Sequence, residues 1–139
     1  MIQLQFIYLI NKLEKVQCRA ARFVVNDYSR YSSVTEILAN LQWNSLKNRR
    51  TVSRLSVLQK SRQNLLALPV NDLLLPARRQ SRHQHPNCFQ VIASNKDCHK
   101  YSYFPQTVKD WNSLPYSITT IEDTKQFKTA VISHLNQQD

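Results

Sequence analysis

Hydrophobic residues near the N-terminus recur at intervals of three and four, which is the spacing of one face of an α-helix. This pattern predicts a helix from Ile2 to about Val25. Asn26 and Asp27 follow, and both tolerate the left-handed backbone that ends many helices. The apolar positions are Ile2, Phe6, Leu9, Ile10, Leu13, Val16, Ala20, Phe23 and Val24.

A second helix is expected after Ser33, because Ser33 and Glu36 have the spacing of an N-terminal capping box. Its apolar side would be formed by Val34, Ile37, Leu38 and Leu41. Trp43 follows, and we predict that it packs in the core beneath the junction.

The stretch from Asn44 to Leu66 alternates apolar and basic residues at helical spacing, and it predicts a long basic helix. Asn44 or Ser45 would cap its start, and Pro69 would stop it. Val52, Leu55, Leu58, Leu65 and Leu66 fall on one side of this helix, and Arg49, Arg50, Arg54 and Lys60 fall on the other.

Regularity fades between residues 77 and 100, where a basic, polar loop is expected. Two short strands are candidates, at Phe89–Ala93 and around Tyr101, Tyr103 and Phe104. Pro105 suits the first turn of a further helix, which Pro115 would end. A last helix would begin at Asp123 or Thr124 and carry an apolar stripe of Phe127, Ala130, Val131 and Leu135.

The pattern as a whole predicts a mainly α fold, a small bundle of four to five helices with a long irregular basic loop. Whether the chain also contains one short β-hairpin is left open. Residues 1–139 would be a single domain or a fragment, with a helical part (1–68), a basic irregular segment (69–100) and an aromatic block with the last helix (101–139). The expected core is Leu13, Val16, Phe23, Leu38, Trp43, Leu55, Leu58, Val108, Trp111 and Phe127.

Charge is distributed unevenly along the chain. The formal net charge is +10, from 19 Lys and Arg against 9 Asp and Glu. Residues 45–100 hold 11 of the basic side chains and 2 of the acidic ones, a difference of +9. Such asymmetry is typical of a polyanion-binding region, and the alternative is an ordinary solvated helix surface.

Three groups of basic side chains are candidates for phosphate contacts with RNA or DNA. One lies on the central helix, one on an N-terminal strip that also includes Lys12, and one in the loop beside His83. The candidate nucleic-acid-binding residues are Arg49, Arg50, Arg54, Lys60, Lys15, Arg19, Arg22, Arg78, Arg79 and Arg82. Tyr101, Tyr103 and Phe104 are candidates for stacking on bases, with the core as their alternative place.

Catalytic chemistry finds little support in the sequence. The chain has no Gly, which excludes Gly-rich phosphate-binding loops. Its acids are scattered, whereas two-metal phosphoryl transfer needs clustered carboxylates. The adjacent Cys98 and His99 lack the surroundings of a nucleophile pair, and His134 is expected to be a partly buried structural residue. We therefore predict no enzyme activity and no cofactor.

The candidate ligands for a zinc site are His83, His85, Cys88, Cys98 and His99. Their spacing matches no standard zinc pattern, so no metal site is predicted. The three cysteines show no disulfide framework, and no Asn-x-Ser/Thr acceptor occurs. The N-terminal apolar run is too short to cross a bilayer and lacks the basic start of a signal peptide. The expected location is the cytoplasm or the nucleus.

Four segments in this order resemble the region that follows the polymerase domain in LINE-type, non-LTR retrotransposon reverse transcriptases of the jockey-like branch. They are LEKVQCRAARFV at 13–24, SSVTEIL at 32–38, LQWNSLKNRR at 41–50 and YSYFPQTVKDWNSLP at 101–115. The resemblance covers residues 12–135. Three positions depart from it: Cys18 stands where a basic residue is usual, Gln42 where Gly is common, and Gln106 where Arg is common.

The resemblance implies a non-catalytic C-terminal piece of an RNA-directed DNA polymerase, encoded by a transposable element. The paired Asp of that family's polymerase motif is missing from this chain. Nucleic-acid contact is the role that the resemblance suggests. Two alternatives stay open: a structural piece that packs on a polymerase thumb domain, and a translated relic without a selected role. The oligomeric state is also left open.

Overall fold

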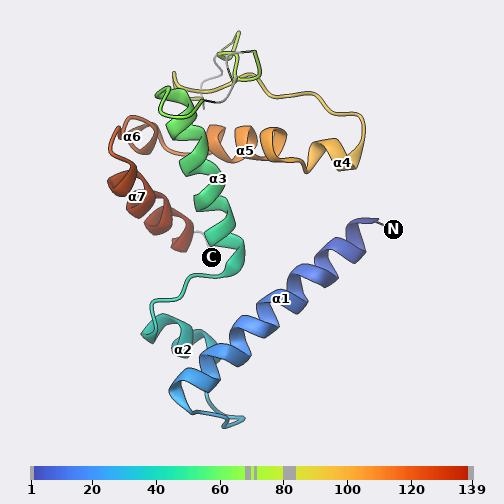
Figure 1. Ribbon diagram of the computed structural model, residues 1–139, viewed down its shortest axis with the longest axis vertical. Coiled ribbons are helices and arrows are strands. Elements are labelled where there is room, and N and C mark those ends of the chain that lie inside the picture. The colour runs from blue at the N-terminus through green and yellow to red at the C-terminus, as the bar shows by residue number, and fades with distance from the viewer. Residues whose placement is uncertain (1, 68–69, 71, 80–83, 138–139) are drawn as a thin grey trace. The chain divides into compact units, whose positions relative to one another are not determined.

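The computed structural model describes residues 2–67, 70, 72–79 and 84–137, with side chains from residue 7 onward. This part of the chain is mainly helical, as the sequence predicts (Figure 1). Two of the helices, α4 and α6, are single turns. The elements are α1 (Ile2–Val25), α2 (Val34–Asn40), α3 (Leu46–Arg62), α4 (Asp97–Lys100), α5 (Tyr103–Asn112), α6 (Tyr116–Thr119) and α7 (Thr124–Asn136).

Neither candidate strand forms as expected. Within the described residues, β-pairing is limited to one isolated antiparallel bridge between Pro76 and Phe89. Tyr103 and Phe104 begin α5 instead of lying in a strand, because the first turn of a helix accepts Pro105. No helix in the described ranges has both the length and the apolar character needed to span a membrane.

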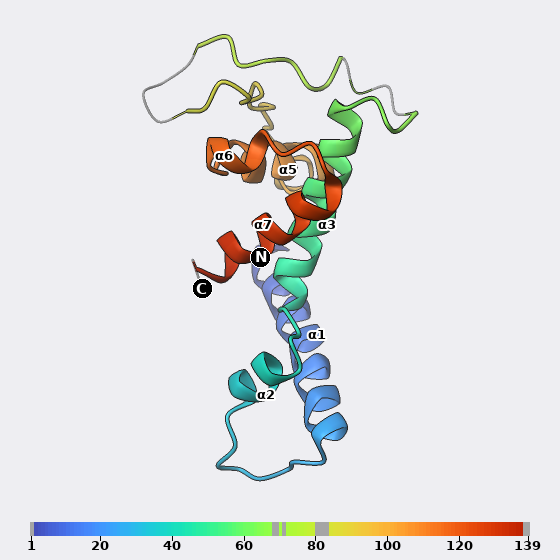
Figure 2. The same ribbon diagram turned by 90° about the vertical axis from the view of Figure 1, so that its left-hand side faces the viewer.

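The chain divides into two compact units, Met1–Arg49 and Arg50–Asp139, and the boundary falls inside α3. In the first unit, α2 packs along one side of α1 (Figure 2). Ala21 of α1 and Ile37 of α2 are buried there. Ser33 caps α2 as predicted, because its hydroxyl oxygen accepts a hydrogen bond from the backbone N–H of Glu36 at 3.5 Å.

Three helices end in the same way although the chain contains no Gly. Asn26, Gln42 and Asn64 each have a positive φ, of 53°, 55° and 56°. After each of them, a backbone N–H reaches back to a carbonyl near the helix end, as in the Schellman motif. Asn64 explains why α3 stops at Arg62, earlier than the predicted Leu66, and leaves Leu65 exposed.

Replacing Gln42 by Gly should stabilise the first unit. Gln42 holds a left-handed backbone at φ 55°, which costs a residue with a Cβ about 1 kcal/mol. Gln42→Gly should therefore raise the free energy of unfolding by up to about 1 kcal/mol, less the entropy that Gly adds to the unfolded chain. Urea unfolding followed by circular dichroism measures this. Gln42→Ala is the control, and a gain of equal size in the control would refute the backbone explanation.

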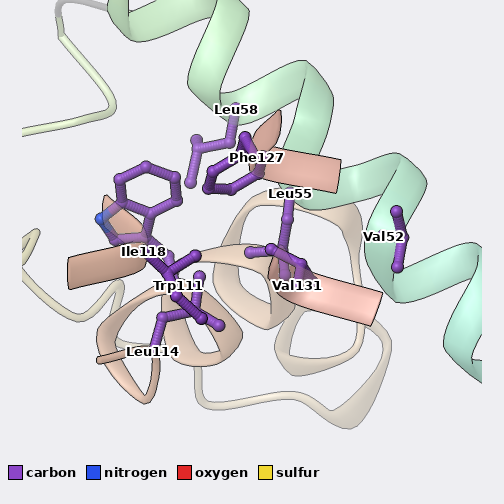
Figure 3. Close-up of a cluster of buried hydrophobic side chains, with 8 residues drawn as sticks. All are labelled: Val52, Leu55, Leu58, Trp111, Leu114, Ile118, Phe127 and Val131. Atoms are coloured by element: carbon purple, nitrogen blue, oxygen red, sulfur yellow. The ribbon is translucent and has the colours of Figure 1, made fainter. Parts of the chain in front are cut away.

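The core of the second unit joins α3 to α5, α6 and α7 (Figure 3). Trp111 lies at its centre with no exposed surface, and its ring stacks on Phe127 at 5.8 Å between centroids. The last helix, α7, begins at Thr124, one of its two predicted starts, and Asp123 caps it by accepting a hydrogen bond from Gln126 N–H at 2.9 Å. The cluster consists of Val52, Leu55, Leu58, Trp111, Leu114, Ile118, Phe127 and Val131.

The predicted core is correct for the second unit and wrong for most of the first. Leu13, Val16 and Phe23 are exposed, and Trp43 is 38% exposed. The reason is that α2 has only seven residues, and the buried side of α1 is the one that carries Gln17 and Ala21. The broad apolar stripe of α1 therefore stays exposed. Leu38 is half-buried.

Candidate nucleic-acid interface

The start of α3 is held by α1. The two carboxylate oxygens of Glu14 accept hydrogen bonds from the backbone N–H groups of Leu46 and Lys47, at 3.3 and 3.0 Å. The hydroxyl of Ser45 accepts a third, from Asn48 N–H at 3.1 Å. These bonds satisfy N–H groups that have no partner inside the helix, and a negative charge is favourable at this end. Local sequence patterns do not predict the Glu14 contact, because 32 residues separate the partners.

Arg49 and Arg50 follow on the first turns of α3, and both are exposed. They lie away from the helix side that carries Val52 and Leu55, which are buried. Their guanidinium groups are therefore available to phosphate oxygens, which Arg binds through paired N–H donors.

Arg54, by contrast, already makes contacts inside the second unit. Its Nη2 donates to Asp110 Oδ2 at 2.9 Å, the one ion pair among the described residues, and to Thr51 Oγ1 at 3.2 Å. Gln106 Nε2 donates to the other carboxylate oxygen of Asp110 at 3.0 Å. Arg54 thus links α3 to α5, and periodicity alone could not distinguish it from Arg49 and Arg50.

Arg22 is also engaged within its own unit. Its guanidinium donates to the carbonyls of Asp27, Ser29 and Ser32, at 3.4, 2.8 and 3.0 Å. These contacts tie the α1–α2 connection to the end of α1. Hydrogen bonds from the Ser32 side chain and the Ser29 backbone lower the pKa of Asp27 in the same connection.

The remaining candidates differ in exposure. Lys15 and Arg19 are exposed on α1, and Lys60 is half-buried on α3. Arg78 and Arg79 are exposed, two and three residues after the bridge residue Pro76. Arg82 and His83 lie outside the described residues. Six of the ten candidates are therefore exposed basic side chains: Lys15, Arg19, Arg49, Arg50, Arg78 and Arg79.

The aromatic candidates are not a flat stacking surface. Tyr103 donates its hydroxyl to the carbonyl of Arg54 at 3.0 Å and packs edge-on against Phe104 at 5.0 Å. Burial raises the pKa of Tyr103, with the nearby charge of Arg54 acting in the opposite direction. Tyr101 is exposed, and the ammonium of Lys100 lies 5.5 Å from its ring centre.

The loop after Pro76 is attached to α5 more firmly than its polar sequence predicts. Asn112 Nδ2 donates to the Phe89 carbonyl at 2.8 Å, and Asn112 Oδ1 accepts from Phe89 N–H at 2.9 Å. Trp111 Nε1 donates to the Asn87 carbonyl at 2.9 Å. His85 is buried, with Nε2 3.4 Å from the Trp111 carbonyl oxygen. Residues 85–90 are therefore part of the second unit's packing.

The candidate zinc ligands are not brought together in the described part of the chain. His85 and Cys88 are buried against α5, whereas Cys98 and His99 are exposed on α4. The described residues contain no group of three or more potential ligands.

The cysteines should differ sharply in alkylation. Burial raises the pKa of Cys88, so less thiolate is present at any given pH, and access to its sulfur is blocked. Cys98 is exposed. At pH 8, iodoacetamide should modify Cys98 at least about tenfold faster than Cys88. Peptide mass spectrometry over time measures the two rates, and in denaturant they should converge. Equal rates in the native protein would show that the loop at Cys88 is not packed.

Comparison with protein-family models, curated proteins and solved structures finds no match for this chain.

Proposed function

We propose that this chain is a non-catalytic C-terminal piece of a LINE-type reverse transcriptase and that it binds RNA or DNA through exposed basic side chains. The observation that carries the proposal is the exposed arginine pair at the start of α3, within a region of the sequence with a charge excess of +9. The family part rests on the four segments that resemble the post-polymerase region.

Binding would act mainly on the phosphate backbone. Arg49, Arg50, Arg78 and Arg79 are exposed. Neutralising phosphates with such residues releases counterions, which gives affinity without sequence readout. Lys15 and Arg19 extend the candidate set on the first unit. Arg54 and Arg22 are better described as structural, because their guanidinium groups already bind a carboxylate and three carbonyls.

The direct test is fluorescence anisotropy with a labelled single-stranded RNA and a matched DNA duplex, over a range of salt concentrations. With about five phosphates contacted, log affinity should fall with log salt at a slope of about −4. The variant Arg49→Ala with Arg50→Ala should reduce the steepness of that slope by about 2, close to one unit per lost contact. Arg54 is left intact, because removing it would also disturb α5.

A matched control removes the same amount of charge elsewhere. Lys125 and Lys128 are exposed on α7, so Lys125→Ala with Lys128→Ala also lowers the net charge by two. If both double variants weaken binding equally, the effect is one of net charge and the proposed site is refuted. A flat salt response of the unaltered protein would refute nucleic-acid binding altogether.

A structural role is the second candidate, and a specific observation favours it. The apolar stripe of α1 is exposed, with Phe23 at 74%. Such a stripe suits a piece that packs on another domain of a longer polymerase chain. The relic hypothesis predicts instead a poorly dispersed proton spectrum for the purified protein.

A further inference from the structure

The exposed apolar residues of α1 are spaced as in a coiled coil. Leu9, Leu13, Val16, Ala20 and Phe23 follow one another at intervals of four, three, four and three. All five are exposed, and the four large side chains are between 51% and 74% exposed. We call these five residues the apolar seam. A seam with this repeat is the surface into which the side chains of a second helix interdigitate.

The two flanks of the apolar seam differ. On one flank, Gln17 is buried and donates from Nε2 to the Asn44 carbonyl at 2.9 Å, so the fold itself uses this side. On the other flank, Lys12 and Arg19 stand seven residues apart, and both are exposed. They occupy the heptad position that flanks the seam, where charged residues face the partner helix.

The acidic residue of α1 cannot balance this basic flank. Glu14 is the only acid in that helix, and both of its oxygens accept hydrogen bonds from the start of α3. A second copy of the chain would therefore bring no carboxylate to Lys12 and Arg19. In an antiparallel pairing of two copies, the basic flanks would face each other and repel.

From this arrangement we infer that the apolar seam binds an amphipathic helix with a heptad repeat and acidic residues beside its own seam. The partner's apolar side chains would cover Leu9, Leu13 and Val16. Its carboxylates would pair with Lys12 and Arg19. This inference does not rest on nucleic-acid binding, since it uses a different surface from Arg49 and Arg50.

The probe is a synthetic helix of about four heptads, with Ile and Leu in its seam and Glu at the flanking positions. A matched peptide carries Lys at those positions. Anisotropy with the complete chain should show about fivefold tighter binding of the Glu peptide. The difference should shrink strongly in about 0.5 M salt, which screens exposed pairs.

Two variants locate the contact. Leu13→Gln with Val16→Gln should weaken binding at least about tenfold, because two apolar contacts are lost while helix propensity is kept. Leu65→Gln with Val91→Gln is the control, since both residues are exposed apolar side chains in the second unit. Lys12→Glu with Arg19→Glu should reverse the preference, so that the Lys peptide binds more tightly.

Each alternative occupant gives its own result. Self-association that Leu13→Gln with Val16→Gln abolishes would show that a second copy covers the seam, and it would overturn the inference. Binding to phosphatidylserine vesicles, lost in the same variant while neither peptide binds, would assign the seam to a membrane surface and also overturn it. A monomer that binds neither peptide nor vesicle would equally refute it. The arginine variants of α3 should leave peptide binding unchanged, so failure of the proposed function is seen separately.

Discussion

Trp111→Ala should abolish cooperative unfolding of the second unit. Trp111 has no exposed surface, stacks on Phe127 at 5.8 Å and packs against Phe89 at 5.9 Å. Its Nε1 also donates to the Asn87 carbonyl at 2.9 Å. Replacing a buried aromatic residue by Ala lowers the free energy of unfolding by about 3–5 kcal/mol. The free energy of unfolding of a small domain is itself only about 5 kcal/mol at the lower end of the usual range. We expect the variant to be largely unfolded at 25 °C.

The other tryptophan provides the matched control. Trp43 is 38% exposed in the first unit, so Trp43→Ala should cost clearly less than Trp111→Ala, about 1–2 kcal/mol. Guanidinium unfolding followed by far-UV circular dichroism compares the two variants. A small loss for Trp111→Ala, similar to that for Trp43→Ala, would show that the aromatic cluster does not stabilise the unit. The hydrophobic pattern predicts that both tryptophans lie in the core, so the two variants test that prediction at each position.

Local signals in the sequence were reliable because their causes are local. Ser33, Ser45 and Asp123 cap helices that begin where their spacing predicts, since a side chain reaches the N–H two or three residues on. Asn26 ends α1 for an equally local reason, its tolerance of positive φ. The mainly helical fold followed from these elements.

Burial on α1 could not be predicted, because it depends on what lies opposite. The same spacing of three and four describes the buried side of α3 and the exposed apolar seam of α1. In α3 the residues Val52, Leu55 and Leu58 meet α5, α6 and α7. In α1 the seam has no such neighbour in the first unit. Periodicity identifies a face that needs a partner and does not identify the partner.

The basic residues illustrate the same limit. Arg49 and Arg54 look alike in a helical projection, yet Arg54 binds Asp110 across 56 residues of sequence. Arg22 likewise donates a hydrogen bond to the Ser29 carbonyl in the connection between α1 and α2. Net charge therefore overstates the surface available to a polyanion. The exposed subset, in particular Arg49 and Arg50, is the part of the candidate site on which binding experiments should concentrate.

Asn112→Ala should release the loop that contains Phe89. The Asn112 amide binds both the N–H and the carbonyl of Phe89, at 2.9 and 2.8 Å, as a neighbouring residue does in an antiparallel strand pair. Removing it leaves two partly buried backbone groups without this partner, at a cost of about 2 kcal/mol. If Phe89 N–H exchanges through opening of this loop, its hydrogen exchange should become about thirtyfold faster.

The pattern of exchange separates this contact from a general loss of stability. Asn95→Ala is the control, because Asn95 is exposed in the same loop. Asn112→Asp keeps an acceptor for Phe89 N–H but loses the donor and brings a negative charge toward the Phe89 carbonyl, so it should protect the loop no better than Asn112→Ala. Unchanged exchange at Phe89 in Asn112→Ala would refute the bridging role. The same increase at every core amide would show instead that Asn112 supports the whole unit, because global unfolding then sets the rate for all of them.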